Sequence, residues 1–336
     1  MARLGIDASS VAPEGKGIDR VQRGTVRSLA ALGAHELVVF ARHPEELPEV
    51  RAVVIRERLS VSWQQWGLPR AVRYHRLDAV LTWTERLPVL GQGRYVVWLF
   101  EPPLHRIRLN RQVGAGVRQR GSDLVTRALW KRSLRRAALV LTGSRATAEA
   151  IREIAPARPL YPGLDPRFAP GPGREGRYVL HLASPDLRDD SGTAIAAARN
   201  AGARLVVAGR YDGAVPEGVE LLGRVSDDEL VALYRGAAAF LDTSLYEGFG
   251  YQALEAMACG TPVVASATTS LPEIVGDAGL LCPPRDADAF AEALQRVLGD
   301  GALADRLRAR GLERARQFTW DRTARALAEA VDEVVG

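Results

Sequence analysis

Two glutamates lie eight positions apart in a glycine-rich stretch, SLYEGFGYQALEAMACGTPVVAS, residues 244–266. Glu247 is followed by Gly248 and Gly250, and apolar residues with helical spacing surround Glu255. The pattern predicts a loop at Glu247 and a helix that carries Glu255 about 12 Å further along, at 1.5 Å per residue. A carboxylate only accepts hydrogen bonds and therefore suits the vicinal hydroxyls of a sugar.

The start of this expected helix is suited to an anion. Gly248 and Gly250 leave the backbone free to present the N–H groups of Phe249 and Gly250 where the helix dipole favours negative charge. A ligand with a sugar, a diphosphate and a ribose in line fits this layout, with Glu247 at the sugar and Glu255 at the ribose.

A second glycine-rich turn follows the first expected strand and reads PEGKGIDRVQRG. Gly15 and Gly17 give G-x-G, but the third glycine of a dinucleotide-binding turn is absent. The two glycines still allow the backbone to approach a ligand closely. A complete fingerprint and a hydride acceptor site are both missing, which argues against a dehydrogenase.

Short strand-like runs alternate with helical patterns twice along the chain, before and after a Pro- and Gly-rich stretch at 161–176. Such alternation predicts α/β architecture: two Rossmann-like, doubly wound parallel-sheet domains facing across a cleft. Ligands of such sheets bind at the carboxyl ends of the strands. The expected divisions are residues 1–162, a linker at 163–176, residues 177–318, and a C-terminal helix at 319–336 that packs back on the first domain.

Composition narrows the classes of protein. The sequence has no run of 18 apolar residues, so no membrane-spanning helix is expected. The first residues, MARLGIDASS, are typical of a first strand rather than a signal peptide. Cys259 and Cys282 have no metal-site spacing, so buried free thiols and a cytoplasmic location are expected.

Charge is unevenly distributed. Residues 1–165 hold 27 basic and 15 acidic residues, whereas residues 166–336 hold 18 and 25. Between Arg106 and Arg136, ten basic residues face one acidic residue. A solvated arginine-rich face, an anionic membrane surface and an acidic substrate all fit this segment. Nucleic acid does not, because aromatics are few and no nucleic-acid module is present.

The chain from Leu222 to Leu281 resembles the donor domain of retaining GT-B glycosyltransferases of the family 4 type, also called glycosyl transferases group 1. Their E-x7-E motif is met by Glu247 and Glu255. LPEIVGDAGLLCPP resembles the sequence that follows it, FTWDRTARALAEAV the closing helix, and YPGLDPRF the segment that links the domains. The resemblance is diffuse in the first half of the chain.

The resemblance implies transfer of a hexose-type sugar from a nucleoside diphosphate sugar to an acceptor, with retention at the anomeric carbon. It assigns the donor to the second domain and the acceptor, a glycan, a lipid-linked molecule or a small molecule, to the first. Glu247 would contact the donor sugar and Glu255 the ribose. The remaining expected donor contacts are Gly15, Gly17, Arg188, Gly223, Arg224, Val225, Gly248, Phe249, Gly250 and Leu254, with Gly223–Val225 near the base.

No metal and no resident cofactor are expected from the resemblance. The D-x-D sequence at Asp286 and Asp288 precedes a helix and is typical of an N-cap. Without a metal, protein groups must stabilise the departing diphosphate.

The sequence departs from the family at two places. Ser184 and Asp189 occupy the approximate positions of the arginine and lysine that the family offers to the diphosphate, which leaves Arg188 as the expected substitute. In the first half, Glu101 and His105 are the candidates for orienting acceptor or donor sugar, near a strand end where relatives often have a histidine.

Two alternatives stay open: a non-catalytic partner subunit that binds sugar nucleotides, and a sugar-nucleotide epimerase of GT-B shape. The chain is expected in the cytoplasm, and association of its basic segment with the inner membrane surface is a further hypothesis.

Overall fold

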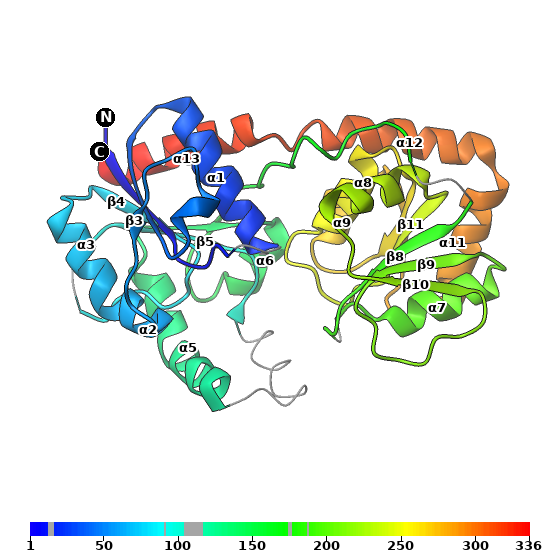
Figure 1. Ribbon diagram of the computed structural model, residues 1–336, viewed down its shortest axis with the longest axis horizontal. Coiled ribbons are helices and arrows are strands. Elements are labelled where there is room, and N and C mark those ends of the chain that lie inside the picture. The colour runs from blue at the N-terminus through cyan, green and yellow to red at the C-terminus, as the bar shows by residue number, and fades with distance from the viewer. Residues whose placement is uncertain (13–16, 91, 104–116, 174–176, 187) are drawn as a thin grey trace. The chain divides into compact units, whose positions relative to one another are not determined.

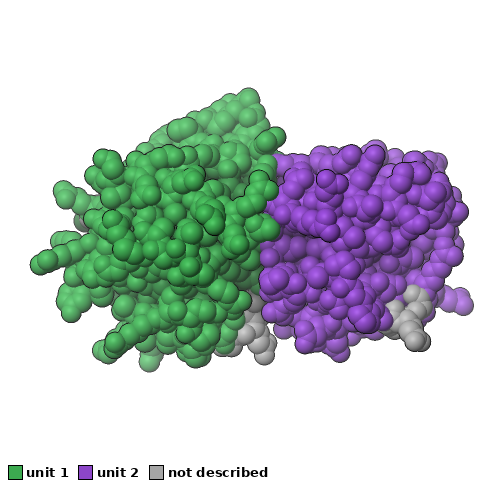
Figure 2. Space-filling model, turned by 90° about the horizontal axis from the view of Figure 1, so that it is seen from above, with its two compact units in different colours: residues 1–163, 319–336 green, residues 164–318 purple. Residues whose placement is uncertain are grey.

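The computed structural model describes residues 1–12, 17–90, 92–103, 117–173, 177–186 and 188–336. The chain forms two compact units, coloured separately in Figure 2. Unit 1 consists of Met1–Gly163 and Thr319–Gly336, and unit 2 of Leu164–Phe318. Each unit contains one parallel sheet with helices on its faces (Figure 1), which confirms the predicted fold class.

In the described part of unit 1, seven parallel strands form a sheet of order β3-β2-β1-β4-β5-β6-β7. The strands are β1 (Arg3–Ala8), β2 (Glu36–Ala41), β3 (Val53–Val54), β4 (Ala79–Thr82), β5 (Tyr95–Leu99), β6 (Leu139–Thr142) and β7 (Arg158–Pro159). The central strands are almost continuously apolar because helices cover both of their faces.

Helices cover both faces of this sheet. They are α1 (Ile18–Leu32), η1 (Pro44–Glu46), α2 (Ser60–Ser62), the π-helix η2 (Trp63–Gly67), α3 (Leu68–Tyr74), α5 (Val117–Arg136), α6 (Arg145–Ile151) and α13 (Trp320–Val335). α13, at the end of the chain, packs on α1 and β4. On a face of the sheet, Trp63, Leu68 and Trp130 join one apolar cluster with residues of β4 and β5.

The sheet of unit 2, over its described residues, has six parallel strands in the order β10-β9-β8-β11-β12-β13. They are β8 (Val179–Ala183), β9 (Leu205–Gly209), β10 (Val219–Gly223), β11 (Ala239–Asp242), β12 (Val263–Ser266) and β13 (Gly279–Cys282). The helices are α7 (Ser191–Asn200), α8 (Asp227–Gly236), α9 (Tyr251–Ala258), α10 (Leu271–Val275), α11 (Ala287–Gly299) and α12 (Gly301–Ala315).

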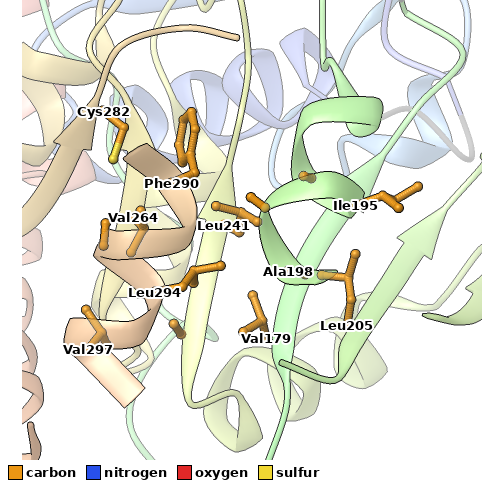
Figure 3. Close-up of a cluster of buried hydrophobic side chains, with 14 of the residues drawn as sticks. Val179, Ile195, Ala198, Leu205, Leu241, Val264, Cys282, Phe290, Leu294 and Val297 are labelled. Carbon is orange, nitrogen blue, oxygen red and sulfur yellow. The ribbon is translucent and has the colours of Figure 1, made fainter. Parts of the chain in front are cut away.

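The core of unit 2 is drawn in Figure 3. Phe290, Leu294 and Val297 recur at helical spacing on α11 and pack against strand residues such as Leu241 and Val264. α7 joins the same cluster through its alanines and Ile195. This packing fixes α7 and α11 on one face of the sheet and thereby holds the strand ends that carry the loops discussed below.

The structure differs from the sequence analysis at several elements. η2 and α5 were not predicted, and the chain from Ala287 to Val335 forms three helices, α11, α12 and α13. These helices are separated because Asp300 and Thr319 each cap a new N-terminus with their side chains. Asp286 accepts a hydrogen bond from the Ala289 N–H, which confirms its predicted role as an N-cap.

Both cysteines are buried free thiols, as predicted. Burial raises the pKa of Cys259 to about 12 and that of Cys282 to about 11, so both stay protonated at neutral pH. No helix in the described ranges is long and apolar enough to cross a membrane.

The contact between α1 and α13 depends on a glycine. A Cβ at Gly24 would lie 2.1 Å from the Trp320 ring, so the two helices approach closely only because Gly24 has no side chain. We expect Gly24→Ala to lower the free energy of unfolding of unit 1 by about 1–3 kcal/mol, the usual cost of overpacking. Urea unfolding measures this change.

Gly121→Ala is the matched control. Gly121 lies in α5, and a Cβ there would meet no atom within 4 Å. Alanine also has the higher helix propensity, so this variant should be neutral or more stable by up to about 1 kcal/mol. Equal destabilisation by the two changes would contradict the role assigned to the contact between Gly24 and Trp320.

Candidate active site

The strand order of unit 2 reverses between β8 and β11. The chain runs from β8 outward to β9 and β10 and then returns to place β11 on the other side of β8. The loops that leave the carboxyl ends of β8 and β11 therefore diverge, and α/β proteins bind ligands in the crevice that such a divergence leaves. The loop at 184–190 follows β8, and the loop at 243–250 follows β11.

Glu247 lies in the loop after β11 and is partly exposed. Its N–H donates to the Thr269 hydroxyl at 2.9 Å, and its carbonyl accepts from the Ser270 hydroxyl at 2.9 Å. The Ser244 hydroxyl donates to Oε1 at 3.3 Å. These contacts on both sides of the residue fix the backbone that presents the carboxyl group.

Negative neighbours surround this carboxyl group. Burial is the largest cause that raises the pKa of Glu247 well above its usual value, followed by the charges of Asp242 and Asp189. The charge of Arg188 and the hydrogen bond from Ser244 oppose this rise. A negative charge on Glu247 is therefore unfavourable beside the carboxyl groups of Asp242 and Asp189.

The glycine turn after Glu247 has the geometry that the sequence predicts. Gly250 has a φ of 98° and is the N-cap residue of α9, a conformation that costs little only for glycine. A Cβ at Gly250 would also lie 3.0 Å from a methyl group of Leu271. Phe249 is buried against the rings of Tyr251 and Phe318, which anchors the turn.

Glu255 is buried on α9, with 3% of its surface exposed. The Tyr234 hydroxyl donates to its Oε2 at 3.1 Å. Glu255 is therefore not an ordinary solvent-exposed helix residue. Burial and the adjacent Glu255 carboxylate raise the pKa of Tyr234 well above its usual value, so the phenol remains a donor. Leu254, another expected donor contact, lies fully in the core.

Arg188 in the loop after β8 is bound to Asp186. Its Nε lies 2.8 Å from Asp186 Oδ2, and its Nη2 contacts the same oxygen. The guanidinium also lies 5.9 Å from the centre of the Tyr246 ring, and the Arg188 carbonyl accepts from the Leu245 N–H. Arg188 therefore lies next to the Glu247 loop, but its charge is shared with an aspartate.

Ser184 and Asp189 bond to each other. The Ser184 N–H donates to Asp189 Oδ2 at 2.9 Å, and the Ser184 hydroxyl donates to the same oxygen. Burial, with the charges of Asp186 and Asp242, raises the pKa of Asp189 from 3.8 to about 6, against the opposing hydrogen bonds of Ser184. The loop after β8 thus adds carboxylates to the site.

Asp242 and His181 belong to this site and were missed by the sequence analysis. Asp242 is the last residue of β11 and is 2% exposed; its Oδ1 accepts from the Ser244 N–H at 3.1 Å. His181 on β8 bonds the Leu241 carbonyl and the Ser191 hydroxyl, each at 2.9 Å. The available signal was a polar residue inside the apolar run VLHLA and another at the end of the apolar run AFLD.

Other predicted residues lie on other loops. Gly223, with a φ of 69°, ends the edge strand β10, and Arg224 after it is exposed. Gly17 is the N-cap residue of α1 in unit 1, and Glu101 follows β5. Gly15 and His105 are outside the described residues. Within the described part of the chain, no three His, Cys, Asp or Glu side chains are placed to hold a metal ion together.

The residues of this site lie in a part of the chain that matches a known protein family. Residues 183–300 match the family described as glycosyl transferases group 1. The matched residues lie within unit 2. They include both glutamates, the loop after β8 and the loop after β10.

Curated relatives match short stretches of the chain. O-antigen chain mannosyltransferase B of Escherichia coli is 48% identical over 103 residues, which are 31% of this chain and 27% of that protein. D-inositol 3-phosphate glycosyltransferase of Salinispora tropica is 43% identical over 124 residues, which are 36% of this chain and 26% of that protein. The chain thus matches about a quarter of the length of these two relatives.

Solved structures match nearly the whole chain. Sucrose-phosphate synthase from Thermosynechococcus elongatus has a TM-score of 0.78 and 22% identity over 99% of both chains. Anabaena HepE in complex with UDP-glucose has a TM-score of 0.74 and 16% identity over 99% of this chain and 100% of that one. At these identities the likeness shows the fold, two Rossmann-like domains of the GT-B type.

The raised pKa of Asp189 predicts a pH dependence of stability. Between about pH 4 and pH 6 the folded chain binds more protons than the unfolded chain, so stability falls as pH rises through this window. Asp189→Asn removes that loss. We expect the variant to exceed wild type at pH 8 by on the order of 1 kcal/mol, about 2–4 °C in Tm, and to match it near pH 4.

Asp212→Asn is the control, because Asp212 is an exposed carboxylate paired with Arg210. Its effect should stay within about 0.5 kcal/mol at both pH values. A Tm difference for Asp189→Asn that is the same at pH 4 and pH 8 would show that burial of the Asp189 charge is not its cause.

Proposed function

We propose that this chain is a metal-independent, retaining glycosyltransferase of the family 4 type that moves a hexose-type sugar from a nucleoside diphosphate sugar to an acceptor hydroxyl. The observation that carries the proposal is the placement of Glu247 and Glu255. One lies in the glycine turn at the carboxyl end of β11 and the other is buried on the helix that follows, within the residues that match glycosyl transferases group 1.

The proposed donor lies along this turn. The ribose binds Glu255, whose buried carboxylate is already oriented by Tyr234. The diphosphate binds backbone N–H groups at Phe249 and Gly250, at the positive end of the α9 dipole. The transferred sugar meets Gly248 and Glu247, and the base meets the loop from Gly223 to Val225.

Arg188 is the proposed cation for the diphosphate. Its bond with Asp186 is partly exposed, with 27% and 21% of the two side chains accessible. Partly exposed ion pairs contribute at most about 1 kcal/mol, so exchanging the carboxylate for phosphate oxygens costs little. A guanidinium can bind two phosphate oxygens at once. When the bond between the anomeric carbon and the diphosphate breaks, Arg188 and the N–H groups stabilise the charge that leaves.

Relatives narrow the proposed donor. The matched proteins include a mannosyltransferase and an inositol-phosphate glycosyltransferase, and HepE was solved with UDP-glucose. We therefore place hexose nucleotides first. The acceptor, a glycan, a lipid-linked molecule or a small molecule, would bind unit 1, where Glu101 is the described candidate for orienting it.

A non-catalytic partner subunit that binds sugar nucleotides is the second candidate. The observation in its favour is the pair Ser184 and Asp189, where the resemblance leads one to expect an arginine and a lysine. Two missing cations weaken stabilisation of the leaving diphosphate more than they weaken ground-state binding of the nucleoside. Binding without turnover is the expected behaviour of such a protein.

The first test is donor hydrolysis. Purified protein is incubated with UDP-glucose, GDP-mannose, dTDP-glucose and ADP-glucose, and release of nucleoside diphosphate is followed beside calorimetric binding. We expect slow release from one donor. Glu255→Ala and Arg188→Ala should each weaken donor binding about tenfold or more, because each removes hydrogen bonds that involve a charged group.

Arg199→Ala removes an exposed arginine of α7 and should leave binding within about twofold. Binding of one donor without any release, also when glycan acceptors are added, would favour the partner-subunit alternative. Absence of binding by every nucleotide would refute the role of the two glutamates.

We further propose that the chain acts in the cytoplasm and that its basic segment, Arg106–Arg136, meets the inner membrane surface. Part of this segment is outside the described residues. In its described part, α5 exposes Arg127, Lys131 and Arg132. Basic residues near an anionic surface each contribute about 1 kcal/mol, which salt screens.

Vesicles that contain phosphatidylglycerol should therefore bind the protein at low salt. They should release it at about 0.5 M salt, because salt screens the attraction between the basic residues and the anionic lipid. Changing Arg127, Lys131 and Arg132 to Gln should weaken binding about tenfold or more. The control changes three exposed arginines of α12, Arg306, Arg308 and Arg310, to Gln. Equal loss in both triple variants would indicate net charge rather than this segment.

A further inference from the structure

The helical stretch that runs through α2, η2 and α3 has an exposed side of aromatic and basic residues. Trp66 is 59% exposed and Tyr74 is 84% exposed, and Arg70 and Arg73 between them are exposed as well. Intervals of three and four residues place these side chains on one side of a helix. The opposite side of the stretch packs into the core of unit 1, so two large aromatic rings are left in water.

α5 covers the same face of the sheet as this stretch. Trp130 of α5 belongs to one apolar cluster with Trp63 of η2 and Leu68 of α3, together with residues of β4 and β5. Because the inner sides of both helical stretches pack on one face of the sheet, their outer sides both point away from it. In Figure 1, α2, α3 and α5 lie below the sheet of unit 1 and α13 lies above it.

The loop that follows β4 connects the two helical stretches. The Gln65 side-chain amide of η2 donates to the Leu87 carbonyl at 3.1 Å, and Gln65 Oε1 accepts from the Val89 N–H at 2.9 Å. On the side of α5, the Ser133 hydroxyl accepts from the Leu87 N–H at 2.9 Å. Leu90 follows these contacts and is 81% exposed. The loop therefore adds a third apolar side chain beside the two helical stretches.

The outer side of α5 carries basic residues after an exposed leucine. Leu124 is 70% exposed, and Arg127, Lys131 and Arg135 follow at intervals of three or four residues, all of them exposed. Trp130 lies on the inner side of the helix and is buried. The helix thus presents apolar and basic side chains together on its outer side.

We call the exposed residues of 60–74, 86–90 and 121–136 the basic apolar face. These stretches hold eight basic residues and one acidic residue, Asp123, which is buried. Their exposed charge is therefore entirely positive. A second copy of the chain would bring the same positive charges against it, since the two-fold interface of a dimer pairs one patch with itself. An anionic lipid surface supplies the opposite charge.

We propose that the basic apolar face docks on an anionic lipid bilayer, with Trp66 and Tyr74 inserted at the level of the lipid headgroups. Tryptophan and tyrosine concentrate at this level of a bilayer, because their rings are apolar and carry one polar atom. Helices that lie in the interface bury an apolar side there while their basic residues meet anionic lipid. The inference rests on the proposed function in one respect, the approach of α5 to an anionic membrane, and adds insertion through the stretch at 60–74.

Insertion is tested by tryptophan fluorescence. The protein is mixed with vesicles of phosphatidylcholine and phosphatidylglycerol, with or without brominated acyl chains, which quench an indole in contact with them. We expect quenching of the wild type and loss of most of it in Trp66→Phe, because the other five tryptophans are buried or partly buried. Phenylalanine keeps the apolar ring, so this variant should bind vesicles within about threefold of wild type.

Affinity for the same vesicles, measured by co-sedimentation, tests the energetic share of the ring. Trp66→Ser should bind about tenfold more weakly or worse, because the apolar area that enters the bilayer is lost. Val215→Ser is the matched control: Val215 is 47% exposed in unit 2, and its change should stay within about twofold. Circular dichroism establishes that each variant is folded, and both should release nucleoside diphosphate like wild type when no vesicles are present.

The outcomes separate the inference from the proposed function. If Trp66→Phe is quenched as strongly as wild type, Trp66 does not enter the lipid and the inference is overturned. Vesicle binding by Trp66→Ser that equals wild type, with loss in the triple Gln variant of α5, leaves the electrostatic association in place and also overturns insertion.

Two further results are decisive. A wild-type dimer in light scattering that Trp66→Ser abolishes, without quenching by brominated lipid, would assign the face to a second copy of the chain and overturn the inference. If the wild type binds no vesicles at any salt concentration, the inference and the proposed membrane association fail together. Glycosyl transfer is untouched by either result, because nucleoside diphosphate release tests it without lipid.

Discussion

The reversal of strand order between β8 and β11 is the constraint on which the rest of unit 2 depends. After β8 the chain continues to β9 on one side, and after β11 it continues to β12 on the other side. The loops that follow β8 and β11 therefore separate at the carboxyl edge of the sheet. Polar residues at this edge, His181 and Asp242, are buried and must find partners within the loops. Ser191, at the start of α7, bonds His181, and the Ser244 N–H donates to one oxygen of Asp242, so hydrogen bonds at the strand ends also shape the candidate site.

The glycine turn before α9 shapes the proposed binding surface at this edge of the sheet. Gly250 adopts a left-handed conformation to start α9, and the buried rings of Phe249 and Phe318 keep the turn against the core. A flexible turn would expose its N–H groups in many orientations and would pay an entropic cost on binding. A turn held by packing presents them in one direction, which is the preorganisation that the proposed stabilisation of a leaving diphosphate requires.

The balance of charge sets this domain apart from a simple anion site. Carboxyl groups from both loops surround one arginine that is already bound to Asp186. An arrangement of this kind binds an anion only if some of the acids are neutral or if Arg188 changes partner. The chemistry of the site therefore depends on where its protons are.

The sequence by itself determined the alternation of strands and helices, the glycine turn and the spacing of the two glutamates, because these follow from local propensity and from periodicity. It did not determine η2 or α5, whose apolar residues pack against distant strands. It also did not reveal the bond from Tyr234 to Glu255, 21 residues apart, or the proximity of Asp189, Asp242 and Glu247. Only the tertiary structure decided these, because strand order brings loops together that are more than 50 residues apart in the chain, and burial then changes the charge that each carboxyl group can hold.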